Sequence, residues 1–134
     1  MASLALAAAA AAAIALTPTV VPVDGETVVE GVPVACTGIG QTKADPKWGA
    51  YPVRIEFSNA AREYLRGGEV TVFDAKGAPI LAVSCDAPWI LLKLPKGAYS
   101  LEGRPLDSPA KPRTARFSPP ASGQMRLVLA FPDA

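Results

Sequence analysis

The sequence contains no histidine, and this absence excludes several classes of site at once. Ser/His/Asp and Cys/His nucleophilic sites both use an imidazole as the general base. Its two cysteines, Cys36 and Cys85, lack the close spacing of a metal-binding pair, so a zinc site would be short of ligands. A Gly-x-Gly stretch begins at Gly38, but no helix is expected after it to hold a phosphate. We therefore expect no metal or other cofactor.

An excess of either charge is also missing. The chain has 13 basic and 12 acidic residues, a formal net charge of +1. No basic run is dense enough to bind nucleic acid or an anionic membrane surface, so neither partner is expected. The segment around Arg104, Lys111, Arg113 and Arg116 is locally basic, and we interpret it as a solvated sheet edge.

A hydrophobic run long enough to span a membrane is absent too. Residues 1–16 are almost purely apolar, and the first charged residue is Asp24. A spanning helix needs about 20 residues, whereas this length suits the core of a signal peptide. Ala13-Ile14-Ala15 resembles a cleavage site, although no Lys or Arg precedes the core. We expect a cleaved signal peptide at residues 1–16, a tether at residues 17–26 and one domain at residues 27–134. The signal peptide implies a periplasmic or secreted location. The alternative for residues 1–16 is a buried alanine-rich helix.

Two cysteines in an exported chain indicate a disulfide between Cys36 and Cys85. Such a bridge would close a loop of about 50 residues and stabilise the fold by about 4 kcal/mol. Free buried thiols and metal ligands are the alternatives. We expect the disulfide.

Short apolar segments separated by turn residues recur about every ten residues, which is typical of an all-β sandwich. Val53, Ile55 and Phe57 alternate with Arg54 and Glu56. Further strands are expected at residues 69–73, 80–85, 99–102, 113–117 and 125–131, with a hairpin turn at 74–77. The run 89–94 is apolar on both faces and predicts a central strand that includes Trp89. Residues 59–66 could form a short helix or an irregular crossover.

Two stretches resemble a known family. One is Asp86-Ala87-Pro88-Trp89 with the later Leu94-Pro95-Lys96-Gly97-Ala98-Tyr99, and the other runs from Tyr64 through the turn Asp74-Ala75-Lys76-Gly77. Together they resemble the carboxypeptidase regulatory-like domains of bacterial envelope proteins, over about residues 53–131. The resemblance implies a single transthyretin-like β-sandwich of about seven strands and a non-catalytic accessory role. Hydroxyisourate hydrolase shares that type of sandwich but uses histidines, which this chain lacks.

Trp48 and Tyr51 are the candidate binding residues. They lie between Pro46 and Pro52 on an expected loop, where two aromatic rings can form a stiff recognition surface. The alternative is that both rings fold back as a lid on the sandwich. Carboxylates such as Glu56 are expected on solvated strand faces.

The sequence therefore predicts an exported, non-catalytic interaction domain that binds an envelope protein or an extracellular polymer. One alternative is a small periplasmic hydrolase that uses an unrecognised carboxylate pair. Another is an inhibitor of a secreted enzyme, with residues 45–52 as its reactive loop. A hydrolase predicts a hollow where two acidic groups converge with shifted pKa values.

Overall fold

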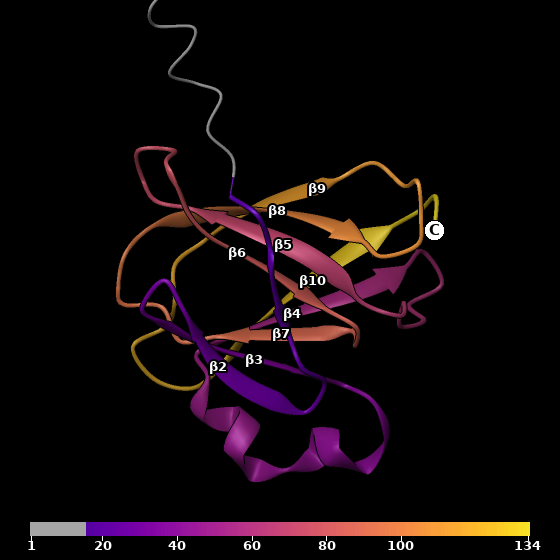
Figure 1. Ribbon diagram of the computed structural model, residues 1–134, viewed down its shortest axis with the longest axis horizontal. Coiled ribbons are helices and arrows are strands. Elements are labelled where there is room, and N and C mark those ends of the chain that lie inside the picture. The colour runs from indigo at the N-terminus through magenta and orange to yellow at the C-terminus, as the bar shows by residue number, and fades with distance from the viewer. Residues whose placement is uncertain (1–15) are drawn as a thin grey trace, which may run out of the picture.

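The computed structural model describes residues 16–134, so most of the expected signal peptide lies outside the described residues. These described residues form two five-stranded sheets packed face to face (Figure 1). Sheet A has the order β1 (Thr19–Val21), β6 (Pro79–Cys85), β5 (Gly68–Phe73), β8 (Tyr99–Pro105) and β9 (Arg113–Phe117). Sheet B has the order β10 (Met125–Phe131), β4 (Val53–Asn59), β7 (Trp89–Leu92), β3 (Val32–Thr37) and β2 (Gly25–Val29). The prediction of an all-β sandwich is confirmed.

Within residues 16–134 the sandwich has ten strands rather than about seven, and three of them lie within residues 19–37. Residues 17–26, expected as a tether, include β1 and the start of β2. β1 pairs in parallel with β6, with Val21 opposite Cys85. Only Val21 of this strand is buried, so its sequence carries almost no alternating pattern. The first strand is held by its backbone pairing, which composition does not reveal.

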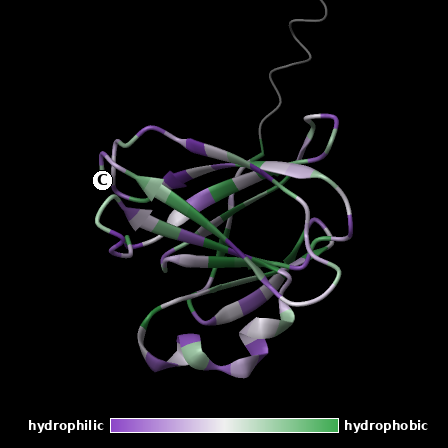
Figure 2. Cartoon of the chain, turned by 180° about the vertical axis from the view of Figure 1, so that it is seen from behind, coloured by the Kyte–Doolittle hydropathy of each residue, from purple (hydrophilic) through white to green (hydrophobic). Residues whose placement is uncertain are grey.

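The core lies between the sheets and is built by strand alternation. Val53, Ile55 and Phe57 of β4 all point into it. Phe57 stacks on Phe131 of β10 with ring centroids 5.9 Å apart, and it lies over Gly68 of β5. A Cβ at Gly68 would collide with the Phe57 ring, so this glycine is required by packing. Figure 2 shows the hydrophobic residues concentrated on the strands, whereas the segment after β3 is mostly hydrophilic or neutral.

A disulfide joins the two sheets. Cys36 of β3 and Cys85 of β6 are both fully buried, with an S–S distance of 2.06 Å and Cα atoms 5.6 Å apart. The predicted disulfide is therefore confirmed, and the structure has no free cysteine among residues 16–134.

β7 is the central strand of sheet B, as its apolar sequence predicts, and all four of its residues are buried. After β7, residues 95–97 carry the chain from sheet B to β8 in sheet A, and Gly97 adopts a φ of 151°. The turn at residues 74–77 joins β5 to β6 as an antiparallel hairpin. β10 runs parallel to β4 along seven paired residues and forms one edge of sheet B. No helix within residues 16–134 is long and apolar enough to cross a membrane.

Candidate functional site

The outer face of sheet B is covered over β3 and β7 by two short 3-10 helices, η1 (Gly40–Ala44) and η2 (Pro46–Ala50), seen at the bottom of Figure 1. Trp48 and Tyr51 are only 3% and 2% exposed. Their rings pack on Ala35 and Leu91, which point away from the main core. The structure thus places both candidate binding residues in a lid that covers the sheet, and neither ring is open to a partner.

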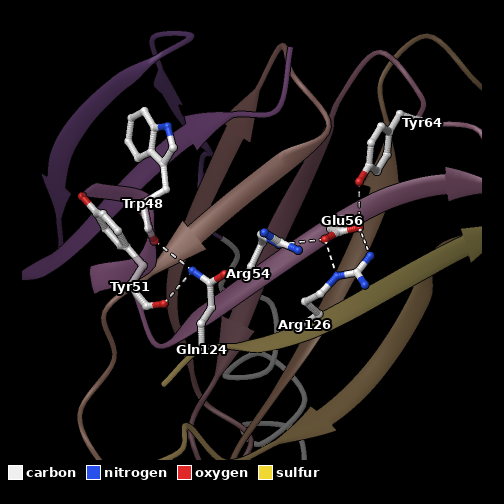
Figure 3. Close-up of polar contacts among 7 residues, drawn as sticks. All are labelled: Trp48, Tyr51, Arg54, Glu56, Tyr64, Gln124 and Arg126. Carbon is white, nitrogen blue, oxygen red and sulfur yellow. Dashed lines mark hydrogen bonds and ion pairs between the residues drawn. The ribbon is translucent and has the colours of Figure 1, made fainter. Parts of the chain in front are cut away.

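Polar contacts hold this lid in place. Trp48 Nε1 donates to the carbonyl oxygen of Thr42 at 2.7 Å. The Gln124 amide donates to the carbonyl oxygens of Trp48 and Tyr51 at 2.8 and 2.9 Å (Figure 3). The Tyr51 hydroxyl donates to Glu26 at 2.5 Å. Burial, followed by the hydrogen bond to Glu26 and its charge, raises the pKa of Tyr51, so the phenol remains a donor. These contacts support a structural role for the lid.

Glu56 lies on the same outer face, over β4, and is 1% exposed. Both of its carboxylate oxygens are bound by Arg126 of β10, with Nε–Oε2 and Nη2–Oε1 distances of 2.7 and 2.8 Å (Figure 3). Arg54 Nε lies 2.7 Å from Oε2, and the Tyr64 hydroxyl donates to Oε1 at 3.2 Å. The Arg54 guanidinium also stacks on Trp89, with Cζ 4.0 Å from the ring centroid.

The expectation that Glu56 is solvated is therefore wrong. Strand alternation puts it on the outer face, but Tyr64 and the two arginines cover that face locally. Burial alone would raise the pKa of Glu56. The hydrogen bond from Arg126 and the charges of Arg54 and Arg126 outweigh burial, and the net pKa lies below its ordinary value. The carboxylate stays ionised.

A hollow of about 440 Å³ lies next to this cluster. Its floor comes from β4 and β10, and its wall comes from the turn after β4. The lining residues are Glu56, Ser58, Arg126, Val128 and Ala130 on the floor and Asn59, Ala60, Arg62 and Tyr64 on the wall. The wall is a tight turn, not the short helix that was one reading of residues 59–66. Asn59 Oδ1 closes this turn by accepting from the backbone N–H groups of Ala61 and Glu63.

The hollow carries a surplus of positive charge. Its one carboxylate, Glu56, is matched by Arg54 and Arg126, and Arg62 adds a third guanidinium that is exposed. The Arg126 side chain is 55% exposed, so its guanidinium binds Glu56 while still facing solvent. Lys43 Nζ lies 5.6 Å from the centroid of the Tyr64 ring at the same side of the sheet. An anionic group is the ligand that this arrangement favours.

A second hollow of about 400 Å³ lies beside the β5–β6 hairpin and is lined by Asp74, Tyr99 and Arg116 among others. Its one carboxylate, Asp74, accepts from the backbone N–H groups of Lys76 and Ala78, at 2.9 and 3.0 Å. These hydrogen bonds give the Asp74 carboxylate a structural role in the turn. Throughout residues 16–134, no group of three or more Cys, Asp or Glu is arranged to hold a metal.

Sequence reasoning missed the cluster because its members come from separate strands. Alternation in the sequence puts Arg54 and Glu56 on one face of their strand, but it does not say which strand lies beside them. The parallel pairing of β10 with β4, which puts Arg126 beside Arg54, emerges only from the topology. Comparisons with protein-family models, with curated proteins and with solved structures found no match.

Proposed function

We propose that this protein is an exported, non-catalytic β-sandwich domain of the carboxypeptidase regulatory-like type, which binds an envelope protein or an extracellular polymer. The observation that carries this proposal is the cationic hollow on sheet B. It combines an oriented arginine (Arg126), an exposed arginine (Arg62) and an exposed apolar side chain (Val128) on a rigid scaffold. The buried disulfide and the apolar leader support export.

The electrostatics of the hollow disfavour the hydrolase alternative. A general acid needs a raised pKa, whereas the Glu56 carboxylate has a lowered pKa and both oxygens bound by Arg126. A glycosidase-type mechanism needs a second carboxyl group facing the first. Each hollow is lined by a single acidic residue, Glu56 in one and Asp74 in the other.

The geometry of residues 45–52 also disfavours the inhibitor alternative. An inhibitory loop must extend freely into an enzyme's cleft, but Trp48 and Tyr51 anchor this segment against sheet B. Asp45 Oδ1 also caps η2 by accepting a hydrogen bond from the backbone N–H of Lys47 at 3.0 Å, which leaves less of the segment in an extended conformation.

The test is chemical cross-linking of the tagged protein in its own host, followed by identification of what is captured. We expect wild type to capture a partner that Arg62→Glu loses, because the charge of the hollow is reversed at an exposed position. Arg113→Glu, an equivalent charge reversal on β9 of the opposite sheet, is the control and should retain the partner. A partner retained by Arg62→Glu would place binding elsewhere. A hydrolytic activity that disappears in Glu56→Gln would contradict the non-catalytic assignment.

A further inference from the structure

In the described part of the chain the sandwich has four edge strands, and three of them carry features that block the addition of another strand. β1 has only three residues. β2 has five residues, includes the charged Glu26, and is followed by residues at positive φ. β9 carries Arg113 and Arg116 and follows directly on Pro112. Short length, edge charge and adjacent proline are the usual means by which sheets avoid edge-to-edge association.

β10 is different. It has seven residues, pairs with β4 in an unbroken register and contains neither proline nor glycine. Arg126 is its one charged residue. Within the described part of the chain β10 pairs with β4 alone, so its other edge has no strand partner. A long, regular and weakly charged edge of this kind is a template for an incoming strand.

The cationic hollow lies directly beside this edge. Arg126 and Val128 are two residues apart, so both side chains stand on the outer face of β10, where they form part of the floor of the hollow. Val128 is 51% exposed. A strand added to β10 would lie about 4.8 Å away, and its side chains on that face would stand beside these two residues. An acidic side chain would meet Arg126, and an apolar side chain two positions away would cover Val128.

We propose that β10 binds an extended acidic segment of a partner protein by strand addition. The incoming strand carries Asp or Glu toward Arg126 and an apolar residue against Val128, while Arg62 on the wall of the hollow adds to the positive charge. This inference rests on the proposed binding function and names the class of partner.

Two other occupants fit less well. A sugar ring would need an open aromatic face, but Lys43 lies over the Tyr64 ring and Trp89 meets it edge-to-face at 6.3 Å. A second copy of this chain would bring another β10, whose one charge is again Arg126, to a surface that is already cationic. Charge complementarity therefore favours an acidic peptide.

The experiment is selection of a displayed library of random nine-residue peptides on the purified domain. We expect enrichment of an acidic residue and an apolar residue two positions apart. Binding of the best synthetic peptide, measured by fluorescence anisotropy, should weaken at least tenfold with Val128→Glu, which removes the apolar contact and repels the acidic side chain of the peptide. Val28→Glu is the matched control, because Val28 is 66% exposed on the β2 edge, and this variant should bind the peptide as wild type does.

A third arm tests the backbone. The same peptide with alternate backbone nitrogens methylated on its pairing edge keeps its charges but loses its ladder donors, and it should not bind. Equal binding of the methylated peptide would overturn strand addition, as would failure of the library to enrich. Binding of polygalacturonate that depends on Arg62 would overturn the peptide assignment while leaving the binding function intact. A dimer in light scattering that Val128→Lys dissolves would assign the edge to a second copy instead. The cross-linking experiment tests the function itself and can fail independently.

Discussion

Replacing Glu56 by glutamine tests the electrostatic reasoning most directly. The substitution keeps the shape of the side chain but removes the charge that neutralises Arg54 and Arg126. Hydrogen bonds to charged groups contribute about 1.5–3 kcal/mol each, and breaking a buried ion pair costs about 3–5 kcal/mol. The Arg126 side chain is 55% exposed and regains water, whereas that of Arg54 is 20% exposed and stays largely covered. We therefore expect Glu56→Gln to lower the free energy of unfolding by about 2–3 kcal/mol.

For a domain of this size that loss corresponds to a fall in Tm of about 8–12 °C. Urea denaturation of the oxidised protein gives the free energy, and calorimetry gives the Tm. Glu102→Gln is the matched control: Glu102 lies on β8, remains partly accessible and pairs loosely with Arg104 at 3.5 Å, so its loss should stay within about 0.5 kcal/mol. A Glu56→Gln effect as small as that of the control would refute the reasoning.

The pH dependence of stability tests whether it is the ionised form of Glu56 that stabilises the fold. Because the folded-state pKa of Glu56 lies below its ordinary value of 4.5, its contribution is fully present above that pH. The contribution is lost as pH falls through the lower, folded-state pKa. The stability difference between wild type and Glu56→Gln should therefore be constant near neutrality and shrink on acidification. A difference that grows toward acid pH would contradict the assignment.

Three further predictions concern the scaffold. The double substitution Cys36→Ala with Cys85→Ala should lower the free energy of unfolding by about 4 kcal/mol, because the bridge closes a loop with a sequence separation of 49 residues. Urea denaturation curves of the double variant and of reduced wild type should agree, and an unchanged denaturation midpoint would contradict a structural role for the bridge. Trp48→Ala should lower the free energy of unfolding by about 3–5 kcal/mol and expose Leu91, which increased binding of a hydrophobic dye would detect. Unchanged stability would mean that the lid does not protect the sheet. Gly68→Ala should destabilise by at least about 1–3 kcal/mol because its Cβ meets the Phe57 ring, whereas Gly49→Ala, with open space around it, should be near neutral in the same thermal melts.

Local patterns in the sequence were sufficient for much of the fold. The apolar run from Trp89 predicts the central strand because a strand covered on both faces has no polar side. Two cysteines in a chain that is expected to be exported predict the bridge, and the turn at residues 74–77 predicts the hairpin. The central strand and the hairpin are each encoded within a few residues, whereas the bridge joins cysteines with a sequence separation of 49 residues.

The candidate site was not predictable in the same way. Alternation tells which side of β4 Glu56 occupies, but burial there depends on Tyr64 and on Arg126, which arrives from β10 through a parallel pairing. Trp48 and Tyr51 have the composition of a recognition loop, yet the outer faces of Ala35 and Leu91 need cover, and the two rings supply it. In both cases the burial of a side chain depends on residues that are distant in the sequence, and a local pattern carries no information about them.

The parallel pairing of β1 and of β10, the first and last strands within residues 16–134, has a consequence for how the chain folds. β1 pairs with residues 83–85 and β10 pairs with residues 53–59, so neither contact forms between neighbours in sequence. Topologies dominated by such distant pairings fold in milliseconds to seconds, because the entropy of closing a long loop is lost before the stabilising contacts form. Glu56 gains Arg126, and Phe57 gains the ring of Phe131, only through the pairing of β10 with β4. The charge pairing and the aromatic stack therefore depend on the same long-range pairing of β10 with β4.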